Sequence, residues 1–167
     1  VARKSITDWD AYSQELENRM GRDDKLMRSI RSMARTATPR RLVFSEGDSL
    51  NTIKAAIHLL SDGIATPILI GSRSKIHALL DEHKLSLDDK YILDFRSDEE
   101  EPRRQRYATL LYSKMSRKGI NHAEALKYMM QRDWFTLMMV ASGDADTSLL
   151  GFGHSYIQSL EPVRQVF

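Results

Sequence analysis

Residues 41–71 constrain the fold more than any other part of the chain. Their sequence, RLVFSEGDSLNTIKAAIHLLSDGIATPILIG, contains an apolar run, a Glu-Gly-Asp turn, a segment of helical period and a second apolar run. Neither apolar run alternates with polar residues, which is typical of strands covered on both faces, as in parallel sheets. Two parallel strands need a crossover connection, and the helical segment between them supplies it. The stretch therefore predicts a βαβ unit.

The rest of the chain continues this alternation. Short apolar runs predict four strands, near residues 42–45, 67–70, 91–94 and 147–150. Segments with helical periodicity lie between and after them, which gives the order β-α-β-α-β-α-α-α-β-α. This order predicts an α/β fold with three layers (α/β/α), in which helices cover both faces of a mainly parallel sheet.

Local signals predict several helix ends. Gly63 follows an apolar helical stripe and predicts its C-terminus. Asn121, with Glu124 three residues later, predicts a capping box. Asp48 or Ser49 is the predicted N-cap of the helix that follows the first strand.

The N-terminal 40 residues have a different character. Their first apolar stripe consists of Trp9, Tyr12, Leu16 and Met20. Gly21 then interrupts the pattern before a second, arginine-rich helical segment, so we predict a helical hairpin, which Pro39 separates from the next strand. The predicted division is an N-terminal helical segment with its linker, 1–40, and an α/β domain, 41–167.

Composition excludes several classes of protein. A net charge of +2, with 29% charged residues of both signs, gives no case for nucleic acid or a membrane surface as the main partner. The chain has no cysteine, so it forms no disulfide and no cysteine-based zinc site. No apolar run reaches the roughly 20 residues that span a bilayer, and no secretory leader is recognisable. These features predict a cytoplasmic protein. The charged run 97–106 predicts a solvated loop and helix start.

The two ends of the sequence predict a piece of a longer protein. The chain begins at Val1 without a methionine, and it stops at Phe167 inside a predicted helix.

Three polar turns follow predicted strands at what should be one edge of the sheet. Backbone N–H groups and helix N-termini meet at the carboxyl ends of parallel strands, where anionic ligands bind. The candidate ligand-binding residues are Ser45, Glu46, Gly47, Gly71, Ser72, Gly151, Gly153, His154 and Ser155. The alternative is that these are plain strand-to-helix turns. Arg73 is a further candidate for gripping a phosphate, with a solvated arginine as the alternative.

The residues predict no catalytic group and no metal site. His154 and Ser155 are neighbours in sequence, so their side chains diverge and do not form a dyad without an orienting acid. The other histidines are scattered without the spacing of metal ligands.

A set of motifs in fixed order resembles one enzyme family. These motifs are RRLVFSEGDS (40–49), AAIHLLSDGIATPILIG (55–71), EPRR (101–104), RKG (117–119) and MMVASGDADTSLLG (138–151). On these segments the chain resembles the phosphate acetyl/butyryl transferase family. It is most similar to the version fused to the C-terminus of bacterial NADP-dependent malic enzymes, whose junction resembles the opening VARKSITDWDAY.

The resemblance implies a function and a set of partners. The family fold has two α/β domains with a cleft between them, of which this chain would be the first part, and it moves an acetyl group between coenzyme A and phosphate. In the malic-enzyme version, the domain is expected to sense acetyl-CoA and to support assembly into homo-oligomers. The parent would oxidatively decarboxylate malate to pyruvate with NADP and a divalent metal (Mg or Mn) on a separate domain. No cofactor is expected on this fragment.

Departures from the family pattern lower the expectation of acyl transfer. The family commonly has an arginine where Met115 lies, and its R-P-A-L motif reads Glu161-Pro162-Val163-Arg164 here. The late serine, arginine and aspartate of the family site fall beyond Phe167. The fragment alone is therefore expected to be inactive. The alternatives are part of an active phosphate acetyl/butyryl transferase, or an oligomerisation scaffold without ligand.

Overall fold

The computed structural model describes residues 8–10, 12–13, 15, 22–151, 153 and 156–167. Contacts divide the chain into two compact units, Val1–Thr38 and Pro39–Phe167. The main described element of the first unit is the helix α2 (Arg22–Thr36). Leu16, Met20 and Gly21, on which the predicted hairpin depends, lie outside the described residues. Within the described ranges, no helix is both long and apolar enough to cross a membrane.

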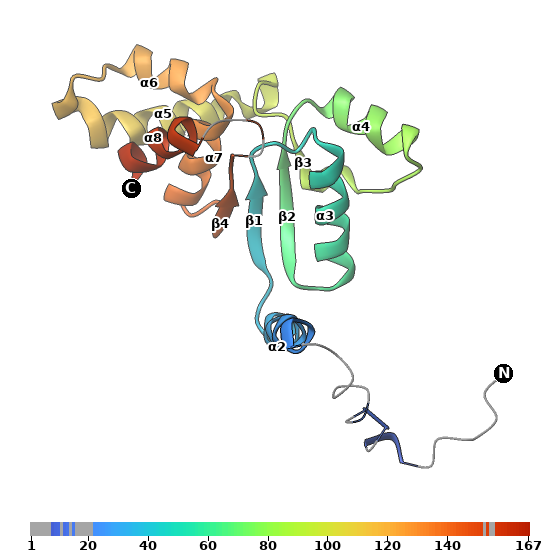
Figure 1. Cartoon of the computed structure of the whole chain (residues 1–167). Coiled ribbons are helices and arrows are strands. Elements are labelled where there is room, and N and C mark those ends of the chain that lie inside the picture. Colours follow the sequence, from blue (N-terminus) through green and yellow to red (C-terminus); the bar gives the residue numbers. More distant parts are fainter. Residues whose placement is uncertain (1–7, 11, 14, 16–21, 152, 154–155) are drawn as a thin grey trace. The chain divides into compact units, whose positions relative to one another are not determined.

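The second unit has the predicted order of strands and helices (Figure 1). Its elements are β1 (Arg40–Phe44), α3 (Leu50–Ser61), β2 (Ala65–Ile70), α4 (Arg73–Glu82), β3 (Ile92–Leu93), α5 (Glu101–Met115), α6 (His122–Met129), α7 (Arg132–Ala141), β4 (Thr147–Leu149) and α8 (Tyr156–Val166). Short 3-10 turns precede β3 (Asp89–Tyr91), precede α5 (Asp98–Glu100) and follow it (Ser116–Lys118).

The four strands form one parallel sheet in the order β3-β2-β1-β4. In its register, Val43 of β1 lies opposite Ile68 of β2 on one side and Ser148 of β4 on the other. β3 pairs with the other side of β2, where Ile92 of β3 lies opposite Leu69 of β2. The predicted parallel pairing of the first two strands is therefore confirmed.

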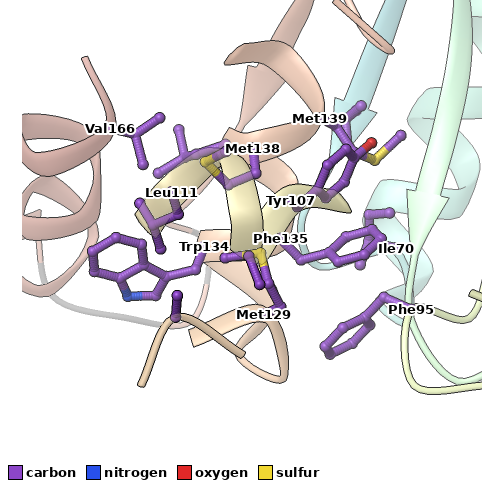
Figure 2. Packing of buried hydrophobic residues seen from close by; sticks show 14 of the residues in the cluster. Ile70, Phe95, Tyr107, Leu111, Met129, Trp134, Phe135, Met138, Met139 and Val166 are labelled. Atoms are coloured by element: carbon purple, nitrogen blue, oxygen red, sulfur yellow. The ribbon is translucent and has the colours of Figure 1, made fainter. Parts of the chain in front are cut away.

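Successive residues of each strand enter two separate cores, because side chains alternate across a sheet. Phe44 and Leu69 pack with α3 and α4 on one face. Val43 and Ile70 pack on the other face, against an aromatic and methionine cluster from α5 to α8 (Figure 2). In that cluster, the ring centroids of Tyr107 and Phe135 lie 5.2 Å apart. The predicted three-layer α/β/α architecture is thus confirmed.

Two of the predicted helix ends are present. Gly63 has a φ of +66°, and Ile64 N–H donates to the Leu59 carbonyl at 3.1 Å, which closes α3 in the manner of a Schellman motif. Asn121 and Glu124 form the reciprocal capping box of α6 at 2.8 and 2.9 Å.

The start of α3 lies at one of the two predicted N-cap positions, but without a capping side-chain contact. Ser49 occupies the N-cap position, but its side chain makes no capping hydrogen bond. The Asp48 carboxylate is also directed elsewhere, because it pairs with Arg132.

The charged run before α5 is not wholly solvated. Arg104 is 5% exposed and donates to the carbonyls of Phe95 and Ser97 at 2.6 and 2.7 Å. Glu101, one turn earlier on α5, accepts from the same guanidinium. Arg104 therefore holds the connection from β3 to α5, since a buried guanidinium is tolerated only when its donors are satisfied.

Candidate functional site

The carboxyl ends of β1, β2 and β4 bring the predicted turns together at one edge of the sheet. Ser45 N–H donates to the Leu149 carbonyl at 3.0 Å, and Gly47 N–H donates to the Ile70 carbonyl at 2.9 Å. Gly71 N–H donates to the Leu93 carbonyl at 3.2 Å. These three N–H groups therefore extend the pairing of the sheet and are not free to bind a ligand.

Gly47 and Gly71 allow the first two turns to approach closely. A Cβ atom on Gly47 would lie 2.7 Å from Leu69 Cβ and 2.8 Å from the backbone nitrogen of Ile70. A Cβ atom on Gly71 would lie 3.1 Å from the backbone nitrogen of Asp48. Packing between turns is sufficient to require glycine at position 47, with or without a ligand.

Glu46 joins the turn after β1 to the turn after β4. Its Oε1 atom accepts a hydrogen bond of 2.8 Å from Gly153 N–H. Gly151 has a φ of +97°, and a Cβ there would lie 3.4 Å from Ser159 Oγ on α8. His154 and Ser155 lie outside the described residues. A carboxylate of the chain itself therefore occupies an N–H group for which an anionic ligand would compete.

Two serines belong to the predicted edge. Ser45 is 1% exposed, and its hydroxyl has no hydrogen-bond partner within the described residues. A buried hydroxyl without a partner costs about 1–3 kcal/mol, so this group would gain from a further polar contact. Ser72 takes the N-cap position of α4, and its hydroxyl lies 3.0 Å from that of Ser74.

An ion pair at this edge was not predicted from the sequence. Arg132, the first residue of α7, donates to both carboxylate oxygens of Asp48, at 2.7 and 2.9 Å. Burial alone would raise the pKa of Asp48, but the hydrogen bonds and charge of Arg132 outweigh it and hold that pKa below its ordinary value. Asp48 is thus a charged residue with a structural role, and its carboxylate neutralises the charge of Arg132.

Arg73 is only partly solvated, because its Nε atom is buried and has no hydrogen-bond partner within the described residues. Its backbone N–H donates to Asp94 Oδ2 at 3.3 Å, while the guanidinium is partly exposed and lies 3.8 Å from Glu99. The part of the chain described here brings together no three His, Asp or Glu side chains that are arranged to hold a metal ion.

A cavity of about 700 Å³ lies between the end of α5, the start and end of α6, and α8. Its lining includes both positions at which the sequence departs from the family pattern, Met115 and Glu161. Lys118 and Arg164 also line it. Met115 and Glu161 are 46 positions apart in the sequence, and the packing of α8 against α5 brings both to the lining of this cavity.

Residues 25–167 match the family described as phosphate acetyl/butaryl transferase. This match covers most of the chain, so the chain belongs to the phosphate acetyl/butaryl transferase family.

Curated relatives divide between two kinds of enzyme. The NADP-dependent malic enzyme of Salmonella typhimurium is 33% identical over 100% of this chain, and that of Escherichia coli is 31% identical over the same share. The phosphate acetyltransferase of Synechocystis is 29% identical over 80% of the chain. The chain spans 22% of the length of each of these two malic enzymes and 19% of that acetyltransferase.

Solved structures share the fold. A phosphotransacetylase from Streptococcus pyogenes superposes with a TM-score of 0.72 and 23% identity, covering 88% of this chain and 43% of that one. The EutD phosphotransacetylase from Staphylococcus aureus gives a TM-score of 0.70 and 19% identity, covering 83% and 41%. At these identities the likeness concerns the fold.

Proposed function

We propose that this chain is part of a phosphate acetyltransferase-like domain of an NADP-dependent malic enzyme, in which it senses acetyl-CoA and supports assembly into a homo-oligomer. The observation that carries the proposal is the extent of the similarity. The malic enzymes match 100% of the chain, including the N-terminal segment, whereas the phosphate acetyltransferases match 80% and 75% of it.

The proposed parent oxidatively decarboxylates malate to pyruvate. We place this chemistry, with its NADP and divalent metal, on a part of the parent outside this chain. The role of the present chain is then to bind an effector and to convey the effect of that binding to the part of the parent that oxidises malate. Phosphate, or another phosphate-bearing ligand, is the alternative effector at the same sheet edge.

The geometry of the sheet edge favours binding over acyl transfer. Attack of phosphate on a thioester needs groups that stabilise the developing negative charge. At this edge, Gly153 N–H is bonded to Glu46 and the Arg132 guanidinium is bonded to Asp48. These contacts suit a site whose hydrogen bonds change when an anionic effector arrives.

A charged substitution at the edge tests the proposal in the intact protein. An Asp side chain at position 153 would start 3.4 Å from Glu46 Oε1, so Gly153→Asp adds bulk and like charge where the effector is proposed to bind. We expect the response of malate oxidation to acetyl-CoA to disappear and the basal rate to persist. Ala55→Asp is the control, because it adds the same charge at an exposed position in the middle of α3.

Steady-state kinetics with and without acetyl-CoA decide whether the sheet edge is an effector site or part of a scaffold without ligand. If the Gly153→Asp enzyme folds and still responds as the parent does, the sheet edge is not the effector site and a scaffold without ligand is favoured. An oligomer that dissociates when this domain is removed would support the assembly role, and sedimentation measures it.

An active phosphate acyltransferase is the second candidate, favoured by the shared fold of the two phosphotransacetylases. Purified intact protein is incubated with acetyl-CoA and phosphate, and acetyl phosphate is measured. We expect no turnover above the uncatalysed background. Turnover that Gly153→Asp abolishes would replace the regulatory proposal with this one.

A further inference from the structure

The helix α2 has an exposed apolar face. Its members recur at the spacing of one helical stripe, and their exposed fractions range from 45% to 62%: Leu26, Met27, Ile30 and Met33. Single apolar side chains are ordinary on a protein surface, whereas four neighbours on one stripe are typical of a surface that a partner covers. Two of the four are methionines, whose flexible side chains adapt to a partner.

The opposite face of α2 is basic. Arg28, Arg31 and Arg35 recur at i, i+3 and i+7, away from the apolar stripe. Residues 22–36 include five basic and two acidic residues, a net charge of +3, so the rest of the chain has a net charge of −1. Two such helices from two copies of the chain would repel each other. The charge therefore disfavours pairing of α2 with itself.

The length of α2 also indicates that it needs a partner. The helix has 15 residues. An isolated helix of about this length is marginally stable in water, and most helices in proteins are stabilised by packing of an amphipathic face. Coverage of the apolar stripe would supply that stabilisation.

The position of α2 in the sequence indicates where the covering surface comes from. The family match covers residues 25–167, so it begins inside the first turn of this helix. The malic enzymes of Salmonella typhimurium and Escherichia coli match 100% of the chain, which spans only 22% of their length. α2 thus lies at the border of the family domain, and most of the length of a malic enzyme lies outside it.

We propose that the apolar face of α2 is a docking surface for the malic-enzyme part of the parent chain. Leu26, Ile30 and Met33 are its anchors, at i, i+4 and i+7, as in helices that bind an apolar groove. The basic face favours acidic side chains at the rim of that groove. The proposal rests on the proposed function, because it takes the parent to be a malic enzyme, and it adds the surface that holds two parts of the parent together.

A photocrosslinker at position 33 identifies the occupant in the intact protein. Met33 is 61% exposed, so the helix surface has room for p-benzoylphenylalanine in its place. Mass spectrometry then identifies the crosslinked peptides, and we expect them to come from the part of the parent that precedes Val1. Peptides from residues 39–167, or from α2 of a second copy, would overturn the proposal. The absence of any crosslinked peptide would overturn it as well.

Hydrogen exchange of the α2 amides in the intact protein measures how well the face is covered. Leu26→Lys and Met33→Lys retain a good helix former but place a charge on the docking face. Each should speed exchange about tenfold or more, because burial of one large apolar side chain exceeds the 1.4 kcal/mol that corresponds to a factor of ten. Ser32→Lys, at an exposed position on the basic side, is the matched control and should change nothing. Exchange in both face variants equal to that in the control would contradict the proposal.

A membrane is the alternative occupant of a basic amphipathic helix. We expect the intact protein not to float with vesicles of phosphatidylcholine and phosphatidylserine. Flotation that Leu26→Lys abolishes would replace the proposed partner with a lipid surface.

Malate oxidation with and without acetyl-CoA, measured on the same preparations, separates this proposal from the proposed function. A protein that oxidises malate and responds to acetyl-CoA, but whose α2 fails the crosslinking and exchange tests, refutes only the docking surface. A protein that crosslinks as expected but shows no response to acetyl-CoA supports the docking surface and refutes the effector role.

Discussion

Asp48 and Arg132 are 84 positions apart in the sequence, yet their side chains meet in a two-point ion pair with N–O distances of 2.7 and 2.9 Å. The pair joins the turn after β1 to the first residue of α7. The backbone of Gly71, after β2, packs against the same aspartate. One carboxylate thus sets the relative position of two turns and a helix at the candidate ligand edge.

We predict that Asp48→Asn destabilises the domain by about 1–2 kcal/mol, between the values for exposed and buried ion pairs. The substitution keeps the size of the side chain but leaves the half-buried Arg132 without its counter-charge. Hydrogen exchange of the β1 amides in the intact protein measures the change in opening free energy. Asp81→Asn, at an exposed position of α4, is the control and should be neutral. Equal exchange in the two variants would show that the ion pair contributes nothing to stability.

We predict that Gly47→Ala costs more stability than Gly63→Ala. At position 47 the new Cβ meets Leu69 and the backbone of Ile70, at 2.7 and 2.8 Å, and overpacking of this kind costs about 1–3 kcal/mol. At position 63 no atom lies within 4 Å, so only the φ of +66° is strained, at about 1 kcal/mol. Urea denaturation of the two variants ranks them. A larger loss in Gly63→Ala would mean that the turn after β1 adjusts without cost.

We predict a loss of stability in acid that depends on Asp146. Its hydrogen bonds with Arg41 lower its pKa from an ordinary value near 3.8 to about 2. A group with a lowered folded-state pKa stabilises the protein above its unfolded-state pKa, and this contribution disappears as the pH falls toward the folded-state value. The stability difference between the parent and Asp146→Asn should therefore be constant above pH 5 and shrink between pH 4 and pH 2. Thermal denaturation at stepped pH measures it, and a constant difference down to pH 2 would contradict the assignment.

We predict a second loss of stability in alkali, due to Tyr107. Burial, together with its hydrogen bond to Asp144, raises the pKa of Tyr107 to about 12. The unfolded chain ionises near pH 10 while the folded protein does not, so the stabilising contribution is complete below pH 10 and declines toward pH 12. The slope approaches 1.4 kcal/mol per pH unit only where the unfolded chain is fully ionised and the folded protein fully protonated, so it stays smaller here.

Tyr107→Phe has no ionisable hydroxyl and isolates this effect. Its stability, measured by urea denaturation at pH 9, 10 and 11, should fall less steeply than that of the parent. Parallel curves for the two proteins would show that Tyr107 ionises equally in the folded and unfolded states.

The sheet was predictable because its signals are local. β1, β2 and β3 each contain a short run of apolar residues, and a crossover helix makes neighbouring strands parallel, so much of the sheet and its intervening helices follows from periodicity. The capping box of Asn121 and Glu124 needs only four consecutive residues. The position of the candidate turns at one edge also follows, because parallel strands end on the same side.

The contacts within that edge were not predictable, because they depend on residues far apart in sequence. Nothing around Asp48 indicates that Arg132 will neutralise it, and the same carboxylate, read locally, is a helix cap. Arg104, outside that edge, lies in a run of charged residues that is typical of a solvated loop, and it is buried because α5 packs back against Phe95 and Ser97, only nine and seven residues earlier. Met115 and Glu161 share a cavity because α8 packs near α5, which a linear pattern does not encode. The assignment of the edge residues to a ligand stays a prediction.

The position of β4 beside β1 also determines how late in synthesis the sheet can finish folding. β1 pairs with β2 across a short crossover, but Arg41 meets its partner Asp146 only after 105 further positions. At a ribosomal rate of about 5–20 residues per second, one side of β1 stays unpaired for about 5–20 s after its synthesis. An open strand edge is a template for pairing with another chain, so this interval is when the nascent protein is most exposed to aggregation. Substitutions that delay the docking of α5 to α7 should therefore lower the yield of soluble protein more than their effect on final stability suggests.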